Sequence, residues 1–411
     1  MSDEDPGVEV RTAWFNPGVR SIGLASFLSD VGHEIPTSLL PSFLTSTLGA
    51  PASALGLIEG IADGAAGVAK LGGGALADDP ERRGKVAVGG YVTTAVLSSS
   101  IGLAVAPWQV GVLRTGAWAA RGVRGPSRNA VLADMVPPDA YGRAYGFERM
   151  ADNLGAIVGP LLAIPLIGLV GVRPAMVVSI VPGMLAALAM LAAVRRVRRP
   201  TPQERRPIRL QVRRVMRGGL GRLLAGVGAF EFGNCAATLL ILRATELLEP
   251  GRGEDSAAAL AVLLYVAYNV AATLASLPAG HLSDRRGTRL VLLGGAWAFL
   301  VAYLLFAAGS SVTLLGLGFV LAGIGIGAAE TAEHAAVATR SAPDIRGAAF
   351  GLLAALQSVG NLAASAVAGI LWTAHSPTVA FLWLAAWMTL ALIAFVTMRP
   401  EGEHPAARAT G

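Results

Sequence analysis

The sequence predicts an all-α membrane protein in which twelve transmembrane helices form two pseudo-symmetric bundles of six. Its composition, its long apolar segments and a repeat between its two halves each point to this fold class. Of the 411 residues, 54% are hydrophobic and only 15% are charged, whereas a soluble domain contains about 25% charged residues. So few charges cannot give a chain of this size a polar surface, which excludes an ordinary water-soluble fold.

The same composition argues against several other classes of protein. Cys235 is the only cysteine, so no disulfide can form within the chain. The net charge of +6 would suggest a nucleic-acid partner in a soluble protein, but here the basic residues lie between apolar segments. The stretch from Met1 to Arg11 is polar and acidic and lacks the basic start of a cleavable signal peptide. We therefore expect the first apolar segment to be retained as a span.

Twelve segments are long and apolar enough to cross a bilayer, whose core of about 30 Å requires roughly 20 residues of helix. We expect them near residues 19–44, 53–76, 86–106, 108–133, 144–171, 174–194, 221–248, 257–280, 290–309, 313–338, 347–373 and 377–398. Most of the connecting loops are short.

The exception is an arginine-rich stretch in the middle of the chain. Eleven arginines and one acid, Glu204, lie between Arg195 and Arg222. This stretch divides the chain into a first bundle (1–194), a cytoplasmic linker (195–219) and a second bundle (220–411). The charge of the linker fixes topology, and contact with anionic lipid head groups is a further possibility.

The distribution of basic residues predicts the orientation of the chain, because cytoplasmic loops carry an excess of Lys and Arg. The loops after the odd-numbered spans contain only Arg173 and Arg252. The loops after the even-numbered spans contain Arg82, Arg83, Lys85, Arg143, the eleven linker arginines, Arg285, Arg286, Arg289, Arg340 and Arg346. We therefore expect both termini to be cytoplasmic, in a cell membrane.

A repeat relates the two halves. The run Gly74 to Asp78 ends the second span, and Gly280 to Asp284 ends the eighth, 206 positions later. Two further pairs of glycines are displaced by 205 positions, Gly146 with Gly351 and Gly155 with Gly360. A constant shift in equivalent loops indicates two bundles of common design, and in transporters built from such parallel repeats the substrate site lies between them.

These loops resemble the signature loops of the major facilitator superfamily, and the resemblance extends over nearly the whole chain. The matching residues are Gly74 and Asp78 in the first copy and Gly280, Asp284, Arg285, Gly287 and Arg289 in the second. The first copy departs from the family pattern, because Asp79 stands where an arginine is usual and about three extra residues follow it. This departure implies a rearranged gate.

Two further segments also resemble the family. Residues 155–160 are similar to part of its antiporter motif, and Arg114 lies where the family has a basic residue. The overall resemblance is to bacterial exporters of drugs or small molecules, and it implies export.

Acidic residues in the first span are the first candidates for proton coupling. Asp30, His33 and Glu34 share one helix face by their spacing, and Asp30 lies roughly 16 Å into the span. Two carboxylates this close do not both ionise easily in a low dielectric, which suits a proton carrier. Glu231 in the seventh span is the second choice, as a pseudo-equivalent of Asp30. For each buried charge a structural ion pair is the alternative.

Spans four and ten carry opposite charges at equivalent positions. The residues are Arg114, Arg121, Arg124 and Arg128 in span four and Glu330, Glu333 and His334 in span ten. We expect Arg124 and Arg128 to meet Glu330 and Glu333 when the cytoplasmic side closes. Such a pair suits a two-state gate, because losing one partner of a buried pair is strongly unfavourable.

Several other polar residues keep two interpretations. Glu59, Asp63 and Lys70 in span two form either a structural salt bridge or part of a substrate site, and Trp118 either packs or stacks on an organic substrate. Glu148, Arg149 and Asp152 are expected to pair with one another near the cytoplasmic end of span five. Asn234, Arg243, Gln357 and Asn361 are candidates for lining a cavity.

The sequence contains no motif of a hydrolase, a zinc protease or a phosphate-binding loop. We therefore expect no enzyme, no cofactor and no metal, and a proton gradient as the energy source. The predicted function is secondary active transport by alternating access, with proton-coupled export of a small organic molecule or drug. Uptake of an anionic metabolite and a transporter-like receptor without flux are the alternatives. The expected partners are the lipid bilayer and a small-molecule substrate, without nucleic acid, and the protein is expected to be a monomer.

Overall fold

The computed structural model describes residues 13–197, 210–250, 253–309 and 311–398, and its long elements are helices. The first bundle contains α2 (Pro17–Ser42), α3 (Ala52–Ala77), α4 (Pro80–Ser100), α5 (Pro107–Ala133), α6 (Tyr141–Val170), α7 (Val172–Val178) and α8 (Ile180–Val194). The short helix α9 (Val212–Val215) follows. The second bundle contains α10 (Gly218–Gly233), α11 (Ala237–Leu248), α12 (Glu254–Arg286), α13 (Thr288–Ala308), α14 (Val312–Arg340), α15 (Arg346–Ala374) and α16 (Pro377–Thr397).

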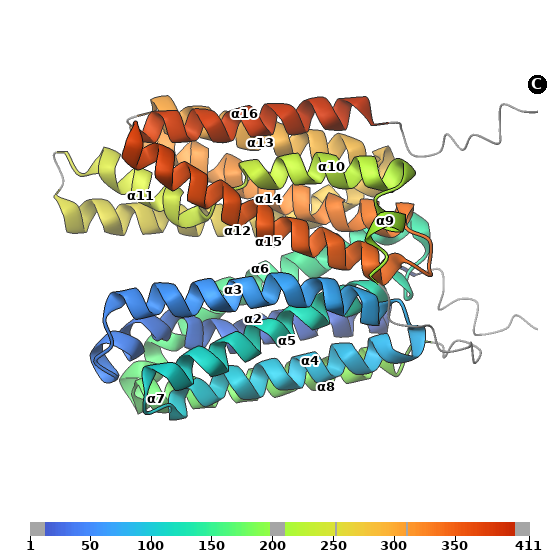
Figure 1. Ribbon diagram of the computed structural model, residues 1–411, viewed down its shortest axis with the longest axis horizontal. Helices are drawn as coiled ribbons and strands as arrows, with labels where there is room; N and C mark the ends of the chain where they lie inside the picture. Colours follow the sequence, from blue (N-terminus) through green and yellow to red (C-terminus); the bar gives the residue numbers. More distant parts are fainter. Residues whose placement is uncertain (1–12, 198–209, 251–252, 310, 399–411) are drawn as a thin grey trace, which may run out of the picture.

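The two bundles lie against each other with their helices running along the same long direction (Figure 1). The first bundle, blue to green, and the second, yellow-green to red, are separate layers in this view. Short single-turn elements η1 (Phe43–Thr47), η2 (Ile101–Leu103) and η3 (Pro138–Ala140) connect some of the helices. The prediction of twelve spans in two bundles is confirmed, with α7 and α8 forming one span and α10 and α11 another.

Those two spans are broken, although the sequence predicts continuous helices over 174–194 and 221–248. The break between α7 and α8 lies at Ser179, because Pro182 has no N–H to donate to the carbonyl three to four residues earlier. The break between α10 and α11 covers Asn234 to Ala236. These residues include no proline, so the sequence does not predict the break.

Side chains from neighbouring helices satisfy the backbone at the second break. Asn361 donates to the carbonyl oxygen of Asn234 at 2.8 Å, and the Ala236 N–H donates to the hydroxyl of Ser365 at 2.8 Å. The hydroxyl of Tyr303 donates to the Gly233 carbonyl at 2.7 Å. Irregular backbone at membrane depth is tolerated only where protein buries it or where it lines a cavity, so this break marks the interior of the molecule.

Charge inside the helices also marks that interior. Nine helical stretches of the described chain are long and apolar enough to cross a membrane. The other three long helices, α2, α3 and α5, contain charged side chains that the first bundle turns inward: Asp30 and Arg124 are each only 4% exposed. These three helices therefore contribute charged residues to the candidate site, together with α6, α10 and α14.

The closest backbone crossings between the bundles lie at one end. A Cβ added to Gly74 of α3 would lie 2.8 Å from the Cα of Gly351 in α15, and one on Gly142 of α6 would lie 2.3 Å from the Gly280 oxygen in α12. Small residues allow such close crossings. Open space surrounds the glycines nearer the opposite ends of α3 and α6, which are Gly60, Gly64 and Gly168. The bundles are thus closed at the end of Asp78 and Asp284, and these glycines toward the other end form no such crossing.

Candidate functional site

A cavity of about 660 Å³ lies between the two bundles. Its charged and polar lining from the first bundle is His33, Glu34, Asp63, Lys70, Trp118, Arg121, Arg124, Arg128, Asn129, Arg149 and Asp152. From the second bundle it is Glu231, Asn234, Glu330, His334, Gln357, Ser358, Asn361 and Ser365. Among the predicted site residues, Asp30, Arg114 and Glu333 lie behind this wall rather than on it.

The candidates on α2 form a network with α5. The guanidinium of Arg121 lies 3.2 Å from the carboxylate of Asp30, and it also contacts the imidazole of His33. The two ring nitrogens of His33 lie 3.4 Å from Asp30 and 3.1 Å from Glu34. The predicted shared face is therefore real, and a cation compensates the charge of Asp30.

Two other arginines of α5 are also neutralised within the first bundle. Arg128 lies 2.7 Å from the Glu148 carboxylate. It also donates to the hydroxyl of Ser26, which in turn donates to Glu148 and so bridges the two side chains. Arg114 lies 3.0 Å from Glu59 and stacks 3.4 Å from the ring centre of Trp118. Of the two alternatives for Glu59 in span two, its ion pair with Arg114 supports the structural one.

Arg124 differs from its neighbours on α5. Its Nη2 donates to the hydroxyl of Ser29 at 2.7 Å, and its guanidinium lies 3.9 Å from the ring centre of Tyr91. It forms no ion pair with any described residue, and its Nη1 lacks a hydrogen-bond partner among them. Arg124 is thus a buried cation that lines the cavity without a counter-ion.

The expected contact of Arg124 and Arg128 with Glu330 and Glu333 is not formed in this structure. Arg149 of α6 makes the connection between the bundles instead, with its Nη1 3.2 Å from Glu330. Arg128 is held by Glu148 within its own bundle, and Glu333 accepts a hydrogen bond from Gln357 at 2.9 Å. The sequence predicted only that Arg149 pairs with Glu148 and Asp152. Arg149 forms both of these ion pairs as well, at 3.0 and 3.2 Å.

Glu231 of α10 occupies a different environment from the carboxylates of the first bundle. It is 2% exposed and accepts a hydrogen bond from the amide of Asn234 at 3.0 Å. Among the described residues it has no ion-pair partner. A carboxyl group buried without a cation is far more stable protonated than charged.

The packing of Glu231 matches that of Asp30. A Cβ added to Gly360 of α15 would lie 2.5 Å from the Cβ of Glu231, and one added to Gly155 of α6 would lie 2.9 Å from the Cβ of Asp30. Gly155 and Gly360 are equivalent in the repeat. Asp30 and Glu231 therefore lie at equivalent places in the two bundles, and each packs against its own copy of the repeated glycine.

At the closed end, each signature acid binds the first turn of a helix in the opposite bundle. Asp78 accepts from the Ala348 N–H of α15 at 2.9 Å. Asp284 accepts from the N–H groups of Gly142 and Arg143 of α6 at 2.6 and 3.0 Å, and from the Arg143 side chain at 2.7 Å. Unpaired N–H groups and the helix dipole favour an anion there, so the two repeats lock each other crosswise.

In the altered first signature loop, Asp78 and its neighbours have different partners from Asp284 in the second loop. Asp79 caps the start of α4, with its carboxylate accepting from the Glu81 N–H at 2.9 Å. Arg83 follows and pairs with Asp134 at 2.5 Å. Asp78 receives the amide of Gln211 at 3.1 Å in place of an arginine. Burial raises the pKa of Asp78 to about 6, against the hydrogen bonds it accepts.

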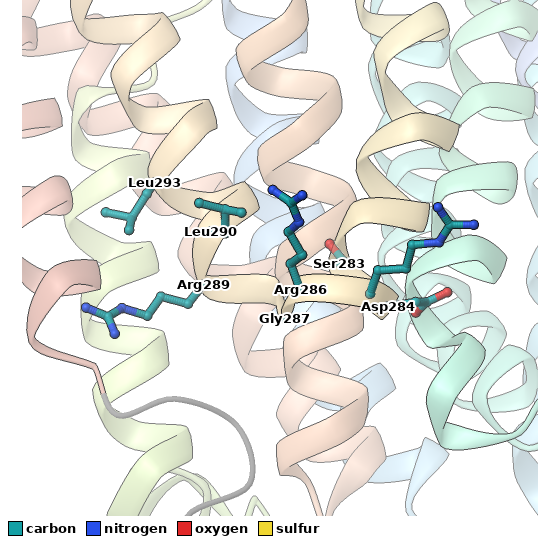
Figure 2. Close-up of a pocket in the computed structure, with 8 residues that line it drawn as sticks. Ser283, Asp284, Arg286, Gly287, Arg289, Leu290 and Leu293 are labelled. Carbon is teal, nitrogen blue, oxygen red and sulfur yellow. The ribbon is translucent and has the colours of Figure 1, made fainter.

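The second signature loop ends α12 and shapes a hollow on the outside of the second bundle. Gly287 has φ +86°, a conformation that favours glycine and stops the helix. Arg289 donates to the Phe395 carbonyl at the end of α16 at 3.0 Å. Figure 2 shows Asp284, Arg286 and Arg289 leaving the loop in different directions. The hollow, about 680 Å³, is lined by residues 283–293 of one bundle, so it is separate from the cavity between the bundles.

Comparison with known proteins agrees with this architecture. Residues 22–245 and 250–411 match the model of the Major Facilitator Superfamily. An uncharacterized MFS-type transporter of Methanocaldococcus jannaschii is 27% identical over 88% of this chain and 90% of that protein. A homolog of the multi-drug resistance efflux pump PmrA from Lactococcus lactis subsp. cremoris is 31% identical over 21% of this chain and 74% of its own length.

A solved structure has the same fold. A bacterial homologue of the iron transporter ferroportin, in an outward-facing state, matches with a TM-score of 0.76 and 16% identity over 92% of this chain and 98% of that chain. The family match covers most of the sequence, and the two bundles enclose a cavity that both of them line. The chain therefore belongs to the major facilitator superfamily, as a multi-pass membrane protein and secondary transporter rather than an enzyme.

Proposed function

We propose that this transporter exports a small organic molecule in exchange for protons. The observation that carries the proposal is Glu231, a carboxyl group that lines the cavity, accepts a hydrogen bond from an amide and has no ion-pair partner among the described residues. Such a group releases its proton when water or a positive ligand group reaches it and takes one up when it is buried again. That exchange is what coupling to a proton gradient requires.

Asp30, with Glu34 and His33, supports this function in another way. Asp30 forms an ion pair with Arg121 at 3.2 Å, so we assign it to holding α2 and α5 together rather than to proton exchange. The first choice from the sequence therefore becomes the second here, and Glu231 becomes the first.

Alternating access follows from the contacts between the bundles. In our proposal the end closed by Asp78 and Asp284 faces the cytoplasm, in accord with the arginine-rich loops, and the cavity opens to the outside. Switching requires both locks and the ion pair of Arg149 with Glu330 to separate. The pair spans the bundles at 3.2 Å, so it contributes to the barrier between the two states.

Export is supported by the similarity of residues 155–160 to the antiporter motif and by the partial match to an efflux pump homolog. In this fold, Gly155 lies against the Phe27 carbonyl and Asp30, so the motif forms the contact of α6 with α2. Uptake of an anion draws less support from α5, because Arg114, Arg121 and Arg128 already have carboxylate partners.

Proteoliposomes loaded with a pH-sensitive dye test the proposal. A panel of organic cations, anions and zwitterions is added outside, the lumen content is measured by mass spectrometry, and the dye reports proton movement. Exchange predicts that any compound that enters makes the lumen more alkaline, and that Glu231→Gln removes this change. Entry without proton movement would exclude coupling, and no entry by any compound under any gradient would favour a receptor.

A further inference from the structure

We propose that the cavity selects a polar zwitterion, whose anionic group binds Arg124 and whose protonated amine binds Glu231. This inference rests on the proposed function, because it names the class of molecule that the transporter carries. It depends on two ionisable side chains, one in each bundle, that are buried without an ion-pair partner among the described residues.

Arg124 is the first of these side chains. It is 4% exposed, lines the cavity and forms no ion pair with a described residue. One of its terminal nitrogens has no hydrogen-bond partner there. A guanidinium group that is buried without a counter-ion is unfavourable, and an anionic ligand group that binds it removes that cost.

Glu231 is the second side chain, on the opposite wall. It is 2% exposed, lines the same cavity, and has only the Asn234 amide as a hydrogen-bond partner among the described residues. Three groups of other helices also act on it electrostatically: Lys70 from α3, and Glu330 and Glu333 from α14. Lys70 binds the hydroxyl of Ser358 instead, so the Glu231 carboxylate is available to an amine.

The other buried charges on the cavity wall already have partners. Arg128 pairs with Glu148, Asp152 pairs with Arg149, and Arg149 also pairs with Glu330. Asp63 is exposed and accepts a hydrogen bond from Trp118. Lys70, which is partly buried, also lines the cavity without a carboxylate partner, but its ammonium group binds the hydroxyl of Ser358. Among the fully buried side chains of the wall that the structure describes, Arg124 and Glu231 are therefore the positive and the negative group without an ion pair.

The backbone holds both groups in place. A Cβ on Gly90 of α4 would lie 2.4 Å from the Cβ of Arg124, and one on Gly360 of α15 would lie 2.5 Å from the Cβ of Glu231. Each charged side chain thus starts from a tight crossing of two helices. Preorganised charges of this kind bind a ligand without first losing conformational freedom.

The remaining wall indicates a hydrophilic ligand. Most drug-sized sites are largely apolar with a few polar groups, whereas here the apolar lining residues are Ala66, Ala236, Ala354 and Leu362. The second bundle adds Gln357, Asn361 and Ser365, which hydrogen-bond to polar atoms. A volume of about 660 Å³ accommodates a small molecule, so we infer an amino-acid-like or comparable zwitterion rather than a large hydrophobic drug.

This assignment also explains exchange. The Glu231 carboxyl holds either a proton or the amine of the ligand, because an ammonium group requires the charged form. Binding of the ligand then releases one proton from this site, and departure of the ligand on the other side allows one to return.

Thermal unfolding of the purified full-length protein in detergent tests the selectivity. The probes are matched trios on one carbon skeleton: an amino acid, its N-acetyl derivative, which is only an anion, and its amide, which is only a cation. We expect stabilisation by zwitterions and at least tenfold weaker binding, by calorimetry, of both partners in a trio. Hits confined to one charge class, or no zwitterion among the hits, would overturn the proposal.

Substitutions assign each charge to its end of the ligand. Arg124→Gln should weaken binding of the zwitterion about 10- to 100-fold. The zwitterion and its amide should then bind this variant with equal affinity. Glu231→Gln should do the same for the zwitterion and its N-acetyl derivative, and Arg124→Lys should restore part of the affinity. If either substitution weakened all three probes equally, the two-ended site would be wrong.

A matched control pair lies outside the cavity. Arg243 and Glu246 of α11 face each other at 3.9 Å and do not line the cavity, so Arg243→Gln and Glu246→Gln should leave the order of affinities unchanged. Without ligand, Arg124→Gln and Glu231→Gln should unfold no earlier than the parent protein, because neither loses an ion pair. Earlier unfolding of both would indicate a structural role instead.

Binding in detergent requires neither a bilayer nor a gradient. A zwitterion that binds but moves no protons in proteoliposomes would therefore contradict the proposed exchange and leave the site intact. Proton-coupled flux of a compound with a single charge would contradict the site and leave the exchange intact.

Discussion

Asp30 and Glu231 lie at the same place in the two bundles and differ in what neutralises them. Each packs against the equivalent glycine, Gly155 or Gly360. Asp30 has a guanidinium partner, Arg121, whereas Glu231 has an amide, Asn234. The two positions are equivalent, but only Asp30 has an ion-pair partner among the described residues, which is why we propose Glu231 and not Asp30 as the group that exchanges a proton.

The same difference recurs at the closed end. Asp284 accepts from the side chain of Arg143, whereas its equivalent, Asp78, accepts from the amide of Gln211. In each equivalent pair, one acid has an arginine and the other an amide. The two halves of the repeat thus place an acid at the same position but give it different partners. The acid with an arginine is suited to a stable contact, and the acid with an amide is suited to titration.

The largest effect should come from Glu231→Gln. An amide cannot carry a proton, so coupled proton movement should be abolished, while thermal unfolding in detergent stays unchanged or shifts upward because a buried carboxyl group without a cation has been removed. Dye-loaded proteoliposomes and thermal unfolding measure the two quantities. Proton movement that survives in this variant would end the comparison, since Glu231 would then be no more exchangeable than Asp30.

Asp30→Asn should have the opposite profile. Losing one partner of a buried ion pair typically costs about 3–5 kcal/mol, and we expect about 2 kcal/mol here because the Arg121 side chain is 32% exposed. Thermal unfolding of the purified protein gives this value. The double substitution, Arg121→Gln with Asp30→Asn, should recover part of this loss, whereas proton movement per transported molecule should be retained in both variants.

Glycine substitutions test whether position, and not only chemistry, separates the two acids. Gly360→Ala and Gly155→Ala each place a methyl group under 3 Å from the opposing side chain, which should cost about 1–3 kcal/mol in stability. Only Gly360→Ala should also reduce transport, because it displaces the exchangeable acid. Gly168→Ala and Gly369→Ala, where open space surrounds the glycine, should change neither property; equal loss of transport in both test variants would contradict us.

The sequence predicted the spans, the repeat and the residues of the cavity better than it predicted their pairing. Long apolar segments and a constant shift are properties of the chain alone, which is why the two bundles were predictable. The pairing of Arg149 with Glu330 was not predictable, because Glu148 and Asp152 are close to Arg149 in the sequence and also pair with it. Only the crossing of α6 with α14 brings it to Glu330.

The break after Gly233 was missed for a similar reason. It contains no proline, and the hydrogen bonds that compensate it come from Tyr303, Asn361 and Ser365 on other helices. The predicted equivalence of Asp30 and Glu231 is likewise supported by contacts between helices. Asp30 packs against Gly155 and Glu231 against Gly360, and neither contact can be read from the sequence of a single helix.

The smallest effect should be a dependence of closure on pH. Burial raises the pKa of Asp78 to about 6 in the closed state, from an ordinary value of 3.8. The closed state therefore binds the proton more tightly than a state in which water reaches this group, so closure should gain, by up to about tenfold in population, as the pH falls from 7 to 5. Spin labels at Glu81→Cys and Ala342→Cys, two exposed positions at this end, measure it by distance distributions in a Cys235→Ala background.

Asp78→Asn supplies the decisive control for this last comparison. The amide oxygen still accepts from the Ala348 N–H but cannot titrate, so the variant should show at pH 7 the closed population that the parent reaches at pH 5, and no change between them. Asp284→Asn should instead loosen closure at both pH values, because Arg143 loses the carboxylate that it approaches to 2.7 Å. If closure weakened on acidification, or if the two variants behaved alike, the division of equivalent acids into a fixed and a titrating member would not extend to the gate.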